Sequence, residues 1–228
     1  MTTYAFLNQI CPACGNTFEY QSLASTNSFG SPDLDLRPPP MHRNTMHTWV
    51  VRCHQCDCCF KPDSESNDLN VGRIDTEEYK QLRKNQTLPE LAKDFMCLGM
   101  LQKYPDGKIT ALLHAAWVCD DEELELQANT CRKKAYEILA KNYETGLYQH
   151  CADYIGNPKQ GLIALDLLRR SQNFELAQQK IDKVKVAIGK STDDDKKVML
   201  DVLRFQAKKI GKRDDRTYTI HDAVESVI

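Results

Sequence analysis

The chain carries the stretches Cys11-Pro12-Ala13-Cys14 and Cys53-His54-Gln55-Cys56, two Cys-x-x-Cys turns that decide how its N-terminal part folds. A two-residue spacer lets both thiolates of a turn reach one metal ion, and Zn²⁺ prefers four such ligands in a tetrahedron. Each turn is followed by a residue that tolerates the positive φ closing a metal knuckle, Gly15 or Asp57. The sequence therefore predicts one structural zinc ion, held by Cys11, Cys14, Cys53 and Cys56, with no open position for catalysis.

Paired cysteines have two other common uses. A thioredoxin-like redox turn needs a strand-to-helix context, whereas residues 17–23 alternate apolar and polar side chains as a strand does. Disulfides are disfavoured because the other cysteines are scattered through helical-looking sequence and residues 1–10 do not resemble a signal peptide. We therefore expect a reduced, cytoplasmic protein. Competing metal ligands near the turns are Cys58, Cys59, His42, His47 and His54.

Length and charge narrow the class of protein. The 228 residues are 41% hydrophobic with a net charge of −2, which describes a globular protein of one or two domains. No apolar run approaches the roughly 20 residues that cross a bilayer, so we expect no membrane partner. Residues 1–70 hold seven acidic against four basic residues, a net charge of −3 that four thiolates and Zn²⁺ lower to −5. Affinity for nucleic acid comes mainly from Lys and Arg, so this part is a poor candidate for it.

The segment between the two turns is long. Thirty-eight residues separate Cys14 from Cys53, more than the roughly 15 to 20 of a compact four-cysteine site. Three consecutive prolines at 38–40 predict a surface loop or extended rim there, and residues 46–52 suit a strand leading into Cys53. Residues 61–74 are polar and rich in turn formers. We therefore expect a zinc-ribbon domain over 1–70 and a helical domain over 71–228.

From residue 75 onward apolar residues recur at intervals of three and four, as on amphipathic helices. The expected helical stripes cover 88–101, 109–117, 124–139, 162–168 and 174–188, followed by a last helix from Thr192. Breaks at 105–107 and 171–173 predict helical hairpins. The pattern Phe95-x-x-Leu98-Gly99, with Ala111 twelve residues after Gly99, resembles the packing positions of a tetratricopeptide repeat. The predicted fold class is α+β, mostly α, with an N-terminal zinc ribbon and a tetratricopeptide-like helical domain; coincidental hairpin packing is the alternative.

The order of these motifs resembles the bacterial domain-of-unknown-function family 2225. The residues that carry the resemblance are Cys11 to Gly15 with Phe18, Asp33-x-Asp35, the strand into Cys53-x-x-Cys56, Ala116-Trp117, and Leu168-Arg169-Arg170-x-x-Asn173-Phe174-Glu175-x-Ala177. The chain departs from the family pattern at Asp57-Cys58-Cys59 and at Ser171-Gln172. The resemblance implies a zinc ribbon joined to a helical repeat in a bacterial cytoplasm, and it implies no reaction.

No glycine-rich phosphate loop, Gly-x-Ser-x-Gly or His-Glu-x-x-His motif marks the chain as an enzyme. We therefore expect a non-catalytic adaptor whose helical layer, from about residue 75 to 213, holds a segment of another protein. Candidate contacts are polar residues that flank the apolar stripes: Asn142, Arg169, Arg170 and Asn173. Residues 196–216 hold eight basic and three acidic residues, a net charge of +5, in which Lys208 and Lys209 form a candidate docking patch. The alternative is a nucleic-acid-associated protein that uses this basic helix.

Overall fold

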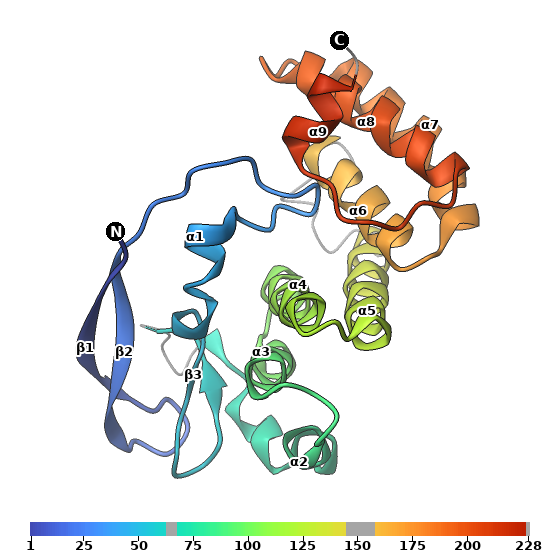
Figure 1. Cartoon of the computed structure of the whole chain (residues 1–228). Coiled ribbons are helices and arrows are strands. Elements are labelled where there is room, and N and C mark those ends of the chain that lie inside the picture. The colour runs from blue at the N-terminus through green and yellow to red at the C-terminus, as the bar shows by residue number, and fades with distance from the viewer. Residues whose placement is uncertain (63–67, 145–157, 227–228) are drawn as a thin grey trace. The chain divides into compact units, whose positions relative to one another are not determined.

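A computed structural model of the chain describes residues 1–62, 68–144 and 158–226, and the side chains of 142–144 lie outside this description. Helices predominate, and the strands form two small antiparallel hairpins (Figure 1). This confirms the mostly helical fold class with its cysteine turns near the N-terminus. None of the described helices is long and apolar enough to cross a bilayer.

The chain divides into two compact units. Unit 1 comprises residues 1–29 and 40–131, and unit 2 comprises residues 30–39 and 132–228. This division differs from the boundary expected between residues 70 and 71. The helices that follow residue 75 belong to the unit of the cysteine turns as far as residue 131, and the middle of the loop between the turns belongs to unit 2.

Two hairpins carry the cysteine turns of unit 1. Strand β1 (Thr3–Ile10) pairs with β2 (Thr17–Ser25), which confirms the strand predicted over 17–23. Strand β3 (Val51–Arg52) pairs with β4 (Cys59–Phe60). Each hairpin therefore has its Cys-x-x-Cys turn at its closed end.

The strand expected over 46–52 is wrong for most of its length. After the short helix α1 (Pro40–Arg43), residues Met46–Thr48 form a 3₁₀ helix. The Thr45 hydroxyl donates to the His42 carbonyl at 2.7 Å and accepts from the Trp49 indole nitrogen at 3.0 Å. Such local side-chain hydrogen bonds stabilise a turn in competition with a strand.

Three helices complete unit 1. A 3₁₀ turn (Val71–Asp75) leads into α2 (Glu77–Lys84), which is followed by α3 (Glu90–Leu101) and α4 (Pro105–Asp121). The expected break at 105–107 is instead the first turn of α4, because proline suits the first helical position. A Cβ on Gly99 would lie 3.3 Å from Ala111 Cβ, so these small residues do let α3 and α4 approach closely. The tetratricopeptide-like repeat itself stays a prediction.

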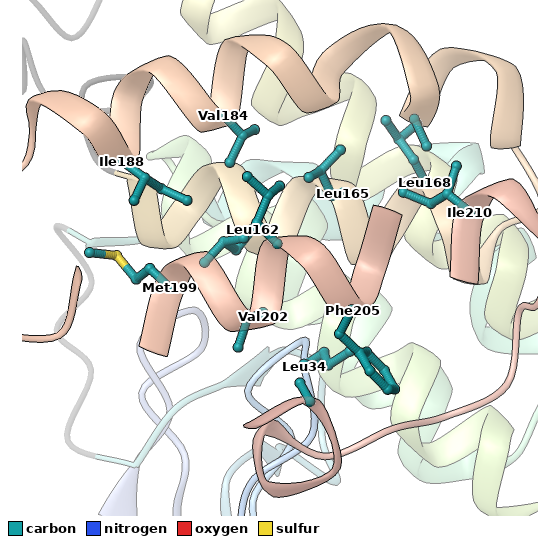
Figure 2. Close-up of a cluster of buried hydrophobic side chains, with 13 residues drawn as sticks. Leu34, Leu162, Leu165, Leu168, Val184, Ile188, Met199, Val202, Phe205 and Ile210 are labelled. Carbon is teal, nitrogen blue, oxygen red and sulfur yellow. The ribbon is translucent and has the colours of Figure 1, made fainter. Parts of the chain in front are cut away.

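Unit 2 is built around three helices, α6 (Pro158–Arg170), α7 (Phe174–Lys190) and α8 (Lys196–Gly211). Helix α5 (Glu125–Glu144) precedes them and contains the division between the units, and the short α9 (Ile220–Glu225) follows them. Apolar side chains from α6, α7 and α8 form one buried cluster, as the stripes predicted (Figure 2). The last long helix begins at Lys196 rather than near Thr192, with Asp195 at its N-cap position.

The prediction of a surface loop around the prolines is wrong for most of residues 33–39, because all of them except Leu36 are buried or half-buried. Leu34 is 4% exposed and lies in the apolar cluster of unit 2 (Figure 2). Its backbone nitrogen donates to the Tyr218 carbonyl at 2.9 Å, and Ile220 donates to the Pro32 carbonyl at 2.9 Å. One apolar side chain and its backbone hydrogen bonds thus place this segment in the core of unit 2.

Candidate metal centre

The two cysteine turns have the same backbone geometry. In the first knuckle (residues 11–16) the Cys11 nitrogen donates to the Asn16 carbonyl at 2.8 Å, and in the second (residues 53–58) Cys53 donates to Cys58 at 2.9 Å. The residue after each Cys-x-x-Cys has the predicted positive φ, +72° at Gly15 and +56° at Asp57. The two turns therefore close with the same backbone hydrogen bond and the same positive φ.

The four predicted ligand atoms lie together. The sulfurs of Cys11, Cys14, Cys53 and Cys56 are all within 4.8 Å of one another. Two distances join the knuckles: 3.6 Å from Cys11 to Cys56 and 3.7 Å from Cys14 to Cys53. A tetrahedron with metal–sulfur bonds of about 2.3 Å has edges of about 3.8 Å, whereas a disulfide bond measures about 2.05 Å. The arrangement therefore fits one tetrahedral metal ion.

The competing ligands lie outside the metal-binding group. Cys58 is buried and contributes its carbonyl to the second knuckle, while the Cys59 thiol contacts the Asp57 carbonyl at 3.5 Å. His54 packs edge-on against Phe18, with ring centroids 5.9 Å apart. Within the ranges that the structure describes, the metal-binding group contains the four predicted cysteines and no histidine, and every described cysteine is free of a disulfide. Cys151 lies outside the described residues.

The two thiols of the second knuckle differ: the pKa of Cys53 is lowered, whereas burial raises the pKa of Cys56. Burial acts to raise the pKa of the Cys53 thiol, but hydrogen bonds from the backbone of Cys56 and Gln55 lower it by more. The resulting pKa is about 7, below the ordinary value of a cysteine thiol. Because the thiolate and not the thiol binds a metal, these backbone donors prepare Cys53 as a ligand.

Contacts beyond the sulfurs hold the knuckles in place. Phe18 of β2 packs edge-on against Phe60 of β4, with ring centroids 6.4 Å apart, and so joins the two hairpins. The Tyr79 hydroxyl of α2 donates to the Asp57 carbonyl at 2.8 Å and accepts from the Cys59 nitrogen at 3.2 Å. Tyr79 is 1% exposed, so the second knuckle is anchored to the helices of unit 1 through a buried group.

Comparison of the chain with protein-family models, with curated proteins and with solved structures gave no match. The centre is therefore interpreted from its own geometry, and the resemblance to family 2225 stays a prediction from the order of the motifs.

Two of the predicted partner contacts lie in the interior. Arg169 is fully buried; it donates to Asp166 at 2.6 Å and to the carbonyls of Asp214 and Arg216 at 2.8 and 2.7 Å. Arg170 is 8% exposed. Their burial does not support a partner contact. The guanidinium of Arg169 links α6 to the segment after α8 through these hydrogen bonds.

The other predicted contacts differ in accessibility. Asn173 is half-buried at the N-cap of α7, and Lys208 is exposed on α8. The Lys209 ammonium donates to the Tyr218 hydroxyl at 2.6 Å and to Asp214 at 3.3 Å. Its hydrogen bonds are therefore made within unit 2. The side chain of Asn142 lies outside the described residues.

Buried charges in unit 2 are the feature that sequence reasoning missed. Asp35 and Arg132 are both about 1% exposed and lie 3.7 Å apart. Asp166 is equally buried, and burial raises the pKa of its carboxyl although Arg169 acts to lower it. The Asp33-x-Asp35 motif marked the segment, but nothing in its local pattern indicated burial.

Proposed function

We propose that the chain is a non-catalytic adaptor in which one zinc ion folds the cysteine hairpins and the helices bind a segment of another protein. The observation that carries the metal part is the closed set of four sulfurs, 3.6 to 4.8 Å apart. Four thiolates fill a tetrahedral ion and leave no position for water or substrate. An all-sulfur tetrahedron suits zinc or iron, and zinc is the usual ion of structural sites.

Metal analysis of the purified protein tests this part. We expect about one equivalent of zinc per chain, lost in Cys53→Ser because three thiolates bind the ion far more weakly. Cys58→Ala is the matched control, since it removes a neighbouring buried thiol that is outside the ligand set, and it should keep its zinc. Iron in place of zinc, less than half an equivalent, or full retention in Cys53→Ser would refute the assignment.

Partner binding is proposed for the helices from about residue 75 to 213, which are divided between the two units. Pairs of packed helices bury one face of each helix and leave the other available, which is how helical repeats recognise extended segments. Asn173 and Lys208 are the candidate contacts with accessible side chains among those described. Crosslinking of a partner obtained by affinity capture tests this: crosslinks on α2 to α8 support it, and crosslinks confined to residues 1–60 would contradict it.

Nucleic-acid binding through α8 is the second candidate, favoured by the excess of basic residues over 196–216. Ion pairs within unit 2 weigh against nucleic-acid binding, because they already engage several of these basic side chains. Arg213 and Arg216 pair with Glu175 and Asp214 at 2.5 and 2.8 Å, and Lys209 is engaged as described above. A phosphate-driven complex must weaken steeply with salt. Retention on a nucleic-acid column that falls with salt and is lost in Lys208→Glu would favour this candidate over the adaptor.

A further inference from the structure

A cavity of about 530 Å³ lies in unit 1 beside the second knuckle. Four cationic side chains line it: Arg52, which directly precedes the knuckle, and Lys80, Arg83 and Lys84 of α2. Three carboxylates share the lining: Asp57, Asp75 and Glu90. Its size falls within the range of small-ligand pockets, roughly 300 to 1,000 Å³, and its cationic side chains outnumber its carboxylates by one.

Three cations converge on one carboxylate at the edge of this pocket. Arg52 Nη1 and Arg83 Nη2 lie 2.9 and 3.0 Å from Glu90 Oε2, and Lys93 Nζ bonds Glu90 Oε1. The cations come from β3, α2 and α3, so the fold has assembled a receptor for two carboxylate oxygens. Charge-assisted bonds of this kind are the strong hydrogen bonds of proteins.

Two of the three cations are largely buried, whereas the carboxylate that they bind is exposed. The side chains of Arg83 and Lys93 are 10% and 6% exposed, and Arg83 is also fixed by Asp94 at 2.6 Å. Glu90 is 62% exposed. Ion pairs of an exposed carboxylate contribute little because water competes for both partners. Glu90 can therefore turn out to solvent while Asp94 still holds Arg83.

We propose that this pocket binds a carboxylate side chain of an acidic segment in a partner protein, which takes the position that Glu90 occupies in the free chain. The occupant in the structure is itself a carboxylate, which shows that the spacing of the three cations suits that group. Asp57 and Asp75 share the lining, so the cavity suits the single charge of one carboxylate better than the double charge of a phosphate dianion. The rim residues Lys80 and Lys84 are exposed, so an extended segment can reach the cavity. The inference rests on the proposed adaptor function and names the chemistry of the partner.

The probe is a blocked tetraglutamate peptide added to the metal-loaded full chain, with the arginine side-chain signals followed by NMR. We expect saturable shifts at Arg52 and Arg83. The tetraglutamine peptide should cause none, because it lacks the negative charge. Glu90→Gln should bind tetraglutamate about two- to fivefold more tightly, since an exposed internal competitor is removed. Arg52→Gln and Arg83→Gln should each weaken binding at least about tenfold.

Glu78→Gln is the matched control. Glu78 lies on α2, pairs with Arg73 at 3.4 Å and is outside the cavity lining, so its neutralisation changes the net charge equally without freeing the receptor. Equal tightening in both variants would show a long-range charge effect and overturn the proposal. The proposal would also be overturned if tetraglutamate left the signals of Arg52 and Arg83 unshifted, or if inorganic phosphate bound more tightly than tetraglutamate. Metal content and partner crosslinking test the adaptor function separately. A failure of the adaptor function can therefore be distinguished from a failure of carboxylate binding in this pocket.

Discussion

Each knuckle of the metal centre closes on one residue with a positive φ, Gly15 or Asp57. Gly15 closes the first knuckle at φ +72°, and no atom lies within 4 Å of where its Cβ would be. An alanine there meets no clash but must adopt a left-handed conformation, which costs about 1 to 2 kcal/mol. The energetic role of Gly15 is therefore in its backbone and not in its packing.

We expect Gly15→Ala to lower the affinity for zinc by about tenfold, because the backbone strain arises only when the knuckle forms and so opposes binding. Competition with a chromophoric chelator measures this. Gly72→Ala is the control, since Gly72 also has open space at its Cβ position but is not in the left-handed region. Equal affinities in the two variants would contradict the argument.

His114 gives unit 1 a pH dependence. Its ring lies among Trp49, Phe95 and Trp117, with centroids 4.9 to 5.0 Å away. Burial, with a smaller effect from Lys61, lowers its pKa from 6.5 to about 4. The folded state therefore keeps His114 neutral where the unfolded chain binds a proton.

Stability from this histidine is complete above pH 6.5 and falls as the pH drops from 6.5 toward 4. The slope approaches about 1.4 kcal/mol per pH unit, for a total of up to about 3 kcal/mol. Denaturant unfolding of the wild type and of His114→Phe at pH 7 and pH 5 measures the difference, and acid loss of the metal is common to both. Parallel stability curves would show that His114 does not titrate in this way.

At the scale of elements, close helix packing depends on glycine. A Cβ on Gly161 of α6 would lie 3.0 and 3.2 Å from the two methyl carbons of Val184 on α7. Real Cβ atoms rarely come this close, so a larger residue must displace Val184. Gly189, also on α7, has open space at the same position.

We expect Gly161→Ala to forgo the gain of about 1 kcal/mol that alanine normally brings to a helix, and Gly161→Leu to destabilise unit 2 by about 1 to 3 kcal/mol. Gly189→Ala should show the ordinary gain. In a double-mutant cycle, Val184→Ala should rescue Gly161→Ala by at least about 0.5 kcal/mol. Additive effects in thermal unfolding would mean that the two residues do not compete for space.

At the scale of the whole molecule, the middle of the segment between the knuckles, residues 30–39, belongs to unit 2. Leu34 is 4% exposed within the α6–α7–α8 cluster, whereas Leu36, two residues away, is 52% exposed. Two leucines of one segment therefore offer a direct comparison of buried and exposed positions.

Leu34→Ala should destabilise unit 2 by about 2 to 5 kcal/mol, the usual range for a buried leucine, while Leu36→Ala should change stability by less than about 0.5 kcal/mol. Hydrogen exchange of α6 to α8 measures the local effect. If Leu34→Ala leaves that exchange unchanged, residues 30–39 do not stabilise unit 2.

Local pattern determined a definite part of this protein. Two Cys-x-x-Cys spacings with Gly15 and Asp57 predicted the four-sulfur cluster and both positive φ values, because a knuckle is closed within six residues. The alternation over 17–23 and the three-to-four spacing after residue 75 predicted β2 and the helical stripes for the same reason: each period reports one face of one element.

Only the tertiary structure decided which distant residues each helix, strand or loop contacts. It placed Leu34 and Asp35 in unit 2, buried Arg169 against carbonyls about 45 residues away, and brought Arg52, Arg83 and Lys93 to one carboxylate. These outcomes depend on contacts between residues far apart in the sequence, and polar residues that flank an apolar stripe look alike whether they face water or a buried partner. Local spacing carries no signal for such contacts, so burial and charge pairing follow from the folded chain alone.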